Sequence, residues 1–294
     1  MITFLKVIKM KNKIIVVMYH EVLPINTEFL DNSLCTSIDN FIDHLEFYRN
    51  TFEIVDVNNI YKKTSKIKLL ITFDDGYVGN FKYVFPLLKK YEIPILFFIS
   101  TDFVSKTNGY WILLLKYVKQ KKSSFIFLSK INIFLTPLLI KYNIVNILKL
   151  FFKYSYIEKI NFYIKNSQIR DMFMDWNQIF EMNSSNLVTF GAHTKTHPIL
   201  SKLKYEEQHE EIIGSINVLE KKLNTKISNF AYPFGKAIHF NSDSIKICQS
   251  RKLNIFTTEK GDNNLFDKYY IKRIGIHNEP VSILQEKLKA YYEM

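Results

Sequence analysis

Short apolar runs of strand character alternate along this chain with segments whose apolar residues recur at helical spacing. Residues 14–19, 68–73 and 94–99 are short, apolar and rich in β-branched or aromatic side chains, which is typical of buried strands. Phe41, Leu45 and Tyr48 predict a helix after the first of these runs. Alternating strands and helices favour parallel pairing through right-handed crossovers. The chain is therefore expected to form a doubly wound sheet or a barrel.

The same alternation returns in the second half of the chain. Helices are predicted around residues 176–182 and 212–223, and strands at 187–190, 228–232, 253–256 and 270–274. Residues 107 to about 170 interrupt it, being dense in apolar side chains and lysines, with no glycine after Gly109. We interpret the chain as one catalytic domain, residues 1–294, with a helical insertion at about 107–170.

The insertion is also the segment that could contact a membrane. Its uncharged run, residues 131–140, has about half the length that a membrane span requires. No transmembrane helix is predicted. Two interpretations remain: a helical lid packed on the main domain, or a hairpin that touches the membrane surface.

Cysteine usage and the first residues suggest a compartment. Cys35 and Cys248 are too few for a disulfide framework or a cysteine zinc site. Four lysines between residues 6 and 13 interrupt the apolar residues at the start of the chain, unlike the continuous apolar stretch of a signal peptide. A cytoplasmic protein is expected, with peripheral contact to the inner face of the membrane as a further expectation.

The chain is basic, with 40 Lys and Arg against 28 Asp and Glu, a net charge of +12. Such a charge suits an anionic partner, for example a phospholipid surface or a phosphate-linked substrate. The better explanation is an AT-biased genome, because Lys, Ile, Asn, Phe and Tyr are all abundant. No Arg-rich run is interleaved with aromatic residues, so a nucleic-acid partner is not expected.

Two polar motifs carry the chemistry. The strand predicted at 68–73 ends at Asp74 and Asp75, and the strand at 187–190 leads to His193 and His197. Adjacent carboxylates repel each other, so they persist where a cation, a basic partner or catalysis separates their roles. Either motif alone is more typical of a turn or of surface residues. Because both follow strands and precede helices, together they predict a site at one rim of the sheet.

Three of these residues suit a catalytic metal. Asp75, His193 and His197 supply the three protein ligands that leave a zinc ion one open position. Cobalt and nickel accept the same nitrogen and oxygen ligands. Such an ion lowers the pKa of bound water and polarises a carbonyl, while Asp74 could act as general base. A metal hydrolase is the first hypothesis.

Four successive motifs resemble those of the polysaccharide deacetylase family, also called the nodulation-type deacetylase domain or carbohydrate esterase family 4. They are residues 18–22, residues 72–76, the Asp175-Trp176 segment leading into residues 191–198, and residues 230–235. The resemblance spans about residues 14–275 without the insertion. It implies a distorted (β/α)7-type barrel that removes N-acyl groups, usually acetyl, from amino sugars with a metal held by one Asp and two His.

The resemblance also implies roles for individual residues. Asp74 matches the catalytic base, Asp75 the metal-binding aspartate, and His193 and His197 the metal-binding histidines. The backbone amide beside Phe234 would help to hold the oxyanion, where a preorganised donor matters most.

The chain departs from the family pattern at Ala231, where many members carry an Arg that orients the catalytic Asp; a branch with Ala-Tyr-Pro-Phe-Gly also exists. Arg273 is the candidate replacement, and the alternative is a structural or surface Arg. His277 is a candidate general acid for the leaving amine, although its surroundings match the family motif poorly. His20 ends the first strand at the same rim and is assigned to substrate contact, with a structural role as the alternative.

Two aromatic residues are further candidates for substrate contact. Trp176 is a candidate for stacking on a sugar, as is Trp111, although packing in the core or rim explains Trp176 as well. Tyr232 belongs to the motif at residues 230–235 and is also assigned to substrate binding.

The sequence thus predicts a metal-dependent hydrolase that removes an N-acetyl group from an amino sugar of a surface glycan or its lipid-linked precursor. The expected lack of export, the basic charge and the apolar insertion favour a nucleotide-linked or polyprenyl-phosphate-linked saccharide. Alternatives are a deformylase or other amide hydrolase, and a non-catalytic saccharide-binding protein. Retention of Asp74 beside the metal ligands argues against a protein that only binds.

Overall fold

The computed structural model describes residues 13–25, 34–62, 64, 66–107, 172–261, 263 and 267–292. Almost all of the predicted insertion, and the lysine-rich first twelve residues, lie outside this part of the chain. The helical character of the insertion therefore stays a prediction.

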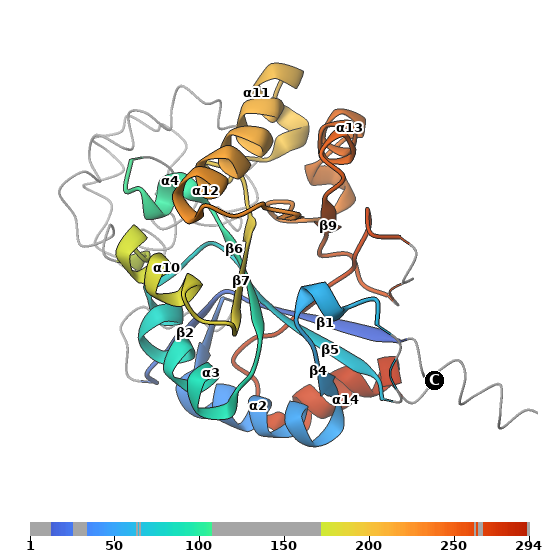
Figure 1. Ribbon diagram of the computed structural model, residues 1–294. Helices are drawn as coiled ribbons and strands as arrows, with labels where there is room; N and C mark the ends of the chain where they lie inside the picture. The colour runs from blue at the N-terminus through green and yellow to red at the C-terminus, as the bar shows by residue number, and fades with distance from the viewer. Residues whose placement is uncertain are drawn as a thin grey trace, which may run out of the picture.

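A curled parallel sheet forms the centre of the molecule (Figure 1). Its strands are β1 (Ile14–Tyr19), β4 (Glu53–Ile54), β5 (Lys68–Phe73), β6 (Ile95–Ile99), β7 (Val188–Ala192), β8 (Asn229–Ala231), β9 (Asn254–Phe256) and β10 (Ile274–Gly275). The order is β10-β1-β5-β6-β7-β8-β9, with β4 also paired to β5, and every pair is parallel. A separate parallel pair joins β2 (Glu21–Leu23) to β3 (Cys35–Ser37).

The segment after β9 brings the two ends of this sheet together. Thr257 donates its backbone N–H to the Ile271 carbonyl, and Ile271 forms a parallel bridge with Phe256 of β9. A few residues later, Ile276 donates its backbone N–H to the Met18 carbonyl of β1. The same short segment thus contacts β9, at one edge of the sheet, and supplies β10, which pairs with β1 at the other edge. This closure confirms the distorted (β/α)7-type barrel.

Helices surround the sheet (Figure 1). The α-helices are α2 (Ile38–Thr51), α3 (Phe85–Tyr91), α4 (Thr101–Val104), α10 (Trp176–Asn183), α11 (Tyr205–His209), α12 (Ser215–Leu223), α13 (Ser242–Ser250) and α14 (Val281–Tyr292). Two π-helical segments, η2 (Asn80–Val84) and η5 (Glu210–Gly214), continue into α3 and α12. Three 3₁₀ turns are η1 (Val57–Asn59), η4 (Leu200–Lys202) and η6 (Ala237–His239).

Strand alternation divides the core into two layers and positions the site. Ile15 and Val17 of β1 belong to the large cluster between sheet and helices, whereas Ile14 and Val16 belong to a smaller cluster that fills the barrel. On β5, Leu70 belongs to this inner cluster. Because side chains alternate along a strand, the inward row of β5 continues through residues 72 and 74, which places the first motif carboxylate at the barrel mouth.

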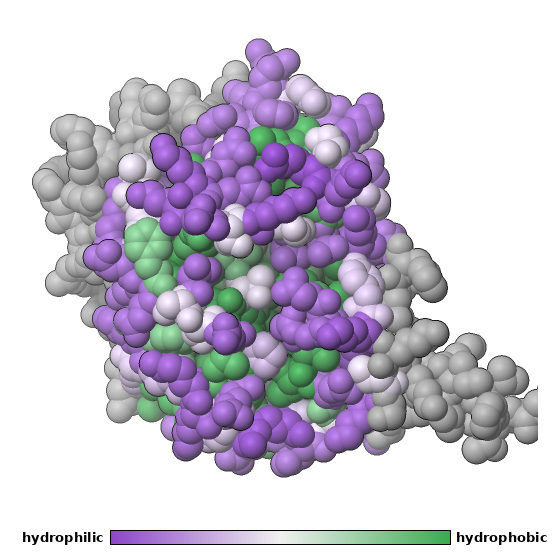
Figure 2. All heavy atoms as spheres, in the orientation of Figure 1, coloured by the Kyte–Doolittle hydropathy of each residue, from purple (hydrophilic) through white to green (hydrophobic). Residues whose placement is uncertain are grey.

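The surface is largely polar on the face shown in Figure 2, where hydrophilic residues cover most of the rim and hydrophobic residues are visible toward the middle. Among the described residues, no helix has both the length and the apolar character needed to cross a membrane.

Candidate metal centre and catalytic site

Asp74 lies immediately after β5 and forms a buried two-point ion pair with Arg273. The two guanidinium nitrogens Nη1 and Nη2 donate to the two carboxylate oxygens at 2.6 and 2.8 Å. Arg273 is 1% exposed, and its Nε donates to the Thr257 carbonyl at 3.1 Å. The guanidinium carbon also lies 5.2 Å from the centre of the Phe98 ring. A planar, fully charged fork held on several sides fixes the orientation of the carboxylate.

This pair keeps Asp74 ionised. Burial alone would raise the pKa of Asp74, but the adjacent charge and hydrogen bonds of Arg273 outweigh it and bring the pKa to about 2. Asp74 is therefore a carboxylate over the whole physiological range.

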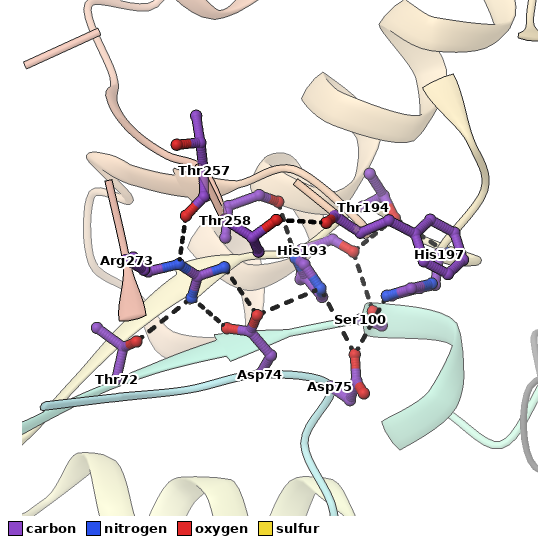
Figure 3. A network of polar contacts seen from close by, with 12 residues as sticks. Thr72, Asp74, Asp75, Ser100, His193, Thr194, His197, Thr257, Thr258 and Arg273 are labelled. Atoms are coloured by element: carbon purple, nitrogen blue, oxygen red, sulfur yellow. Dashed lines mark hydrogen bonds and ion pairs between the residues drawn. The ribbon is translucent and has the colours of Figure 1, made fainter. Parts of the chain in front are cut away.

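Asp75 faces two imidazoles instead. Its Oδ1 lies 3.5 Å from His193 Nε2 and 3.4 Å from His197 Nε2, and all three side chains are buried (Figure 3). One potential ligand atom from each of these residues lies within 4.8 Å of the others. The two neighbouring carboxylates thus occupy different environments. Asp74 is paired with an arginine and lies 3.9 Å from His193 Nε2, whereas Asp75 lies closer to both imidazoles.

The hydrogen bonds of His193 leave one ring nitrogen available for a metal. Its Nδ1 lies 2.7 Å from the Ala231 carbonyl oxygen, which can only accept, so Nδ1 carries the proton. Nε2, the atom that faces Asp75, is then the acceptor. Burial lowers the pKa of both His193 and His197, which favours their neutral forms. Ala231, where the family often has an Arg, contributes to the site through its carbonyl.

The site residues fit a divalent metal of the zinc type. One carboxylate and two imidazoles are the donor set of many three-ligand catalytic sites. Because one donor atom from each residue lies within 4.8 Å of the others, Asp75, His193 and His197 would hold such an ion.

Unusual backbone conformations gather at this site. Asp75, Thr194, His197 and Phe234 all have positive φ angles, between 59° and 73°. The other described residues of this kind follow helices, where left-handed residues are common; they are Glu92, Lys106, Asn224 and Lys252. Non-glycine residues in this region are held there only when their surroundings favour it, which happens most at functional sites.

Neighbouring elements hold the loop that carries both histidines. Ser100, before α4, donates its hydroxyl to the His193 carbonyl at 2.9 Å. The Thr194 hydroxyl accepts the His197 backbone N–H at 3.0 Å. The buried carboxylate of Glu211 accepts hydrogen bonds from the same loop. Ser100 and Glu211 were not identified from the sequence.

The two further histidines lie at the same mouth. Burial lowers the pKa of His20 to about 4, and the charges of Asp74, Arg273, His193 and His277 also act on it. His277 is exposed. Both are near the site, and their roles stay predictions.

Phe234 packs against the loop of residues 193–197, which carries both histidines and is called the histidine loop below. Its ring meets that of His197 edge to face, with 4.8 Å between ring centres. Thr258 donates its hydroxyl to the Phe234 carbonyl at 2.7 Å, which helps to hold the loop after β8. The oxyanion role of the backbone amide beside Phe234 stays a prediction.

Tyr232 and Trp176, the two aromatic residues predicted to bind substrate, are engaged in packing contacts. Tyr232 is 1% exposed and stacks on Phe240 at 4.1 Å, so its ring belongs to the core. Trp176 is half-buried, donates its Nε1 hydrogen to the Ser105 hydroxyl and lies under the Lys222 amine. Substrate contact by either ring stays a prediction that these positions do not support. Trp111 lies outside the described residues.

Comparison with known proteins supports the same family. The family model described as polysaccharide deacetylase matches residues 61–255. The structure of IcaB from Ammonifex degensii is 20% identical, with a TM-score of 0.64 over 96% of this chain and 98% of that chain. The Streptococcus pyogenes deacetylase PplD, in complex with acetate, is 20% identical, with a TM-score of 0.63 over 93% and 97% of the two chains.

A de-N-acetylase from Aggregatibacter actinomycetemcomitans is 17% identical, with a TM-score of 0.62 over 93% of this chain and 99% of that chain. At these identities the structures show a shared fold. No curated protein sequence matches this chain. The matched family model extends over more than half of the chain and includes both motifs that form the site, so the protein belongs to the polysaccharide deacetylase family.

Proposed function

We propose that this protein is a metal-dependent hydrolase that removes an N-acetyl group from an amino sugar. The observation that carries this proposal is the separation of the two adjacent carboxylates: Asp74 is paired with Arg273, and Asp75 faces two imidazoles. A base beside a metal ligand is an arrangement that metal-dependent hydrolysis of an amide uses.

Asp75, His193 and His197 would hold the ion, with zinc preferred and cobalt or nickel as alternatives. When bound, the ion supplies Lewis-acid activation of water and of the amide carbonyl. Asp74, kept ionised by Arg273, would take the proton from the attacking water molecule. Arg273 acts here as a positioning residue for the base.

Two other groups complete the proposed chemistry. The backbone N–H at Phe234 would donate to the oxygen on which negative charge develops. His277, exposed at the mouth near His20, would give a proton to the leaving amine. His20 would contact the substrate at the rim.

The test is release of acetate by metal-reconstituted protein from N-acetylated mono-, oligo- and lipid-linked sugars. Asp74→Asn should abolish release, whereas Asp56→Asn, which removes a carboxylate from the N-cap of η1, should retain it. No acetate from any sugar by protein with stoichiometric metal would contradict the proposal. Formate release would then favour a deformylase, and saccharide binding without any release would favour a binding protein.

For the substrate we propose a saccharide of surface-glycan assembly, linked to a nucleotide or to polyprenyl phosphate. The net charge of +12 supports an anionic substrate or peripheral contact with an anionic membrane. Activity on a free oligosaccharide, with none on the phosphate-linked forms, would overturn this assignment and leave the deacetylase intact.

A further inference from the structure

The buried carboxylate of Glu211 lies against the loop between the two metal-binding histidines. Its Oε2 accepts the backbone N–H groups of Lys195 and Thr196, both at 2.9 Å. Its Oε1 accepts the Thr196 hydroxyl at 2.7 Å. Glu211 is 2% exposed and comes from η5, a π-helical segment inserted between α11 and α12. Such π-helical insertions are frequent at functional sites.

The neighbouring carboxylate has a different role. Glu210 is 66% exposed and pairs with the Lys195 amine at 2.8 Å, a contact at the surface of the same loop. An exposed pair of this kind contributes little. The adjacent glutamates therefore contact the same loop in different ways. Glu210 pairs with a side chain at the surface, whereas the buried carboxylate of Glu211 accepts backbone N–H groups of the loop.

The loop is held from its other side by backbone groups of α4. Thr101 donates its backbone N–H to the Thr194 carbonyl at 3.2 Å, and Asp102 donates to the Lys195 carbonyl at 3.0 Å. The carbonyls of Thr194 and Lys195 are thus satisfied by α4, and the backbone N–H groups of Lys195 and Thr196 by Glu211. Because Thr194 and His197 have positive φ angles, the loop needs such outside contacts to keep its shape.

Burial of a carboxylate is costly unless hydrogen bonds compensate for it. Burial raises the pKa of Glu211, against the effect of its bonds to Lys195 and Thr196. In the described contacts the carboxylate binds Lys195 and Thr196, which lie between the two histidines, and not the histidine rings. Its placement therefore bears on the distance between His193 and His197 more than on either ring.

We propose that Glu211 is a positioning residue that sets the two histidines at metal-binding distance before the ion arrives. The proposal rests on the function proposed above, because it requires that Asp75, His193 and His197 hold a metal. Groups that orient metal ligands typically change metal affinity by about 10–100-fold when removed.

The experiment titrates metal-free protein with Zn²⁺ and with Co²⁺ in the absence of sugar. Glu211→Ala should bind both ions about 10–100-fold more weakly than the unaltered protein. The absorption spectrum of its Co²⁺ form should also change, since the spacing of the two imidazoles changes. Glu210→Ala, the matched control from the adjacent position, should leave affinity and spectrum unchanged.

Glu211→Gln should recover most of the affinity, because an amide oxygen can accept both backbone N–H groups and its NH₂ can donate to Thr196. Unchanged affinity and spectrum in folded Glu211→Ala would overturn the proposal. If that variant fails to fold, Thr196→Val decides: weaker metal binding supports the proposal and unchanged binding overturns it. Failure of the unaltered protein to bind metal would instead contradict the proposed function.

Discussion

At the scale of single residues, the adjacent Asp74 and Asp75 are separated by backbone geometry. Asp74 continues the inward row of β5, so it points toward the centre of the barrel mouth and Arg273. Asp75 has a φ of 73°, which ends the strand alternation and turns its carboxylate toward the histidine loop. The strained conformation of one residue thus separates a repulsive pair into the proposed base and the proposed metal ligand.

Arg273→Met should abolish activity and destabilise the protein by about 3–5 kcal/mol, because it leaves Asp74 buried without its cation. Denaturant unfolding and acetate release measure the two effects. Adding Asp74→Asn to this variant should recover part of the stability but none of the activity. Full activity in Arg273→Met would show that Asp74 is oriented by other groups.

At the scale of elements, β7 approaches β6 and β8 closely because it carries a glycine next to the site. A Cβ on Gly191 would lie 2.7 Å from two ring carbons of Phe98 and 2.9 Å from the Asn229 carbonyl oxygen. Backbone cannot yield as a flexible side chain does, so the approach requires glycine there.

Gly191→Ala should therefore destabilise the protein by about 1–3 kcal/mol through overpacking. The control is Gly275→Ala on β10, where the new Cβ would lie 3.4 Å from the end of the flexible Met18 side chain. That change should alter stability by less than about 1 kcal/mol. Equal effects of the two substitutions, measured by urea unfolding, would contradict this account.

A buried polar chain joins α2 to the segment that carries His277. The Tyr48 and Tyr19 hydroxyls are 2.7 Å apart, and Tyr19 lies 3.0 Å from His44 Nδ1. His44 Nε2 is 2.8 Å from the Glu279 carbonyl, which can only accept, so Nε2 carries the proton of a neutral ring. Burial lowers the pKa of His44 below its usual 6.5, against the opposing effect of the Glu279 carbonyl.

This chain predicts a pH dependence of stability. Because the pKa of His44 is lower in the folded state, its contribution is complete above pH 6.5 and is lost as the pH falls below that value. His44→Gln should make the loss of stability below pH 6.5 shallower by up to about 1.4 kcal/mol per pH unit. Tyr48→Phe should leave that slope unchanged, and an unchanged slope in His44→Gln would rule out this titration.

At the scale of the whole molecule, we expect the fold not to depend on the metal. Both hydrophobic clusters exclude the three proposed ligands, and the histidine loop is already held by bonds to Ala231, Ser100 and Glu211. Hydrogen bonds from the chain itself therefore hold the site.

A chelator should thus abolish activity and leave the far-ultraviolet circular dichroism spectrum unchanged. Returning Zn²⁺ should restore activity and raise the free energy of unfolding, by about 2.7 kcal/mol at a free-ion concentration 100 times Kd. Unfolding of the protein by the chelator alone would show that the metal is structural.

Local patterns in the sequence predicted the class of fold and the candidate metal ligands. The alternation of strands and helices is local, and Asp74, Asp75, His193 and His197 lie in short motifs directly after strand runs. Arg273 was a candidate because the family resemblance implies an arginine beside Asp74 and Ala231 is not one. The contact itself could not be predicted, because the two residues are 199 positions apart in the sequence.

Which of two neighbouring residues is buried became clear only from the tertiary structure. Glu210 and Glu211 look alike in the sequence, yet the turn of η5 exposes one and buries the other. Tyr232 belongs to a motif with the site but stacks in the core. Burial depends on how segments distant in sequence pack together, and local sequence patterns do not predict that packing.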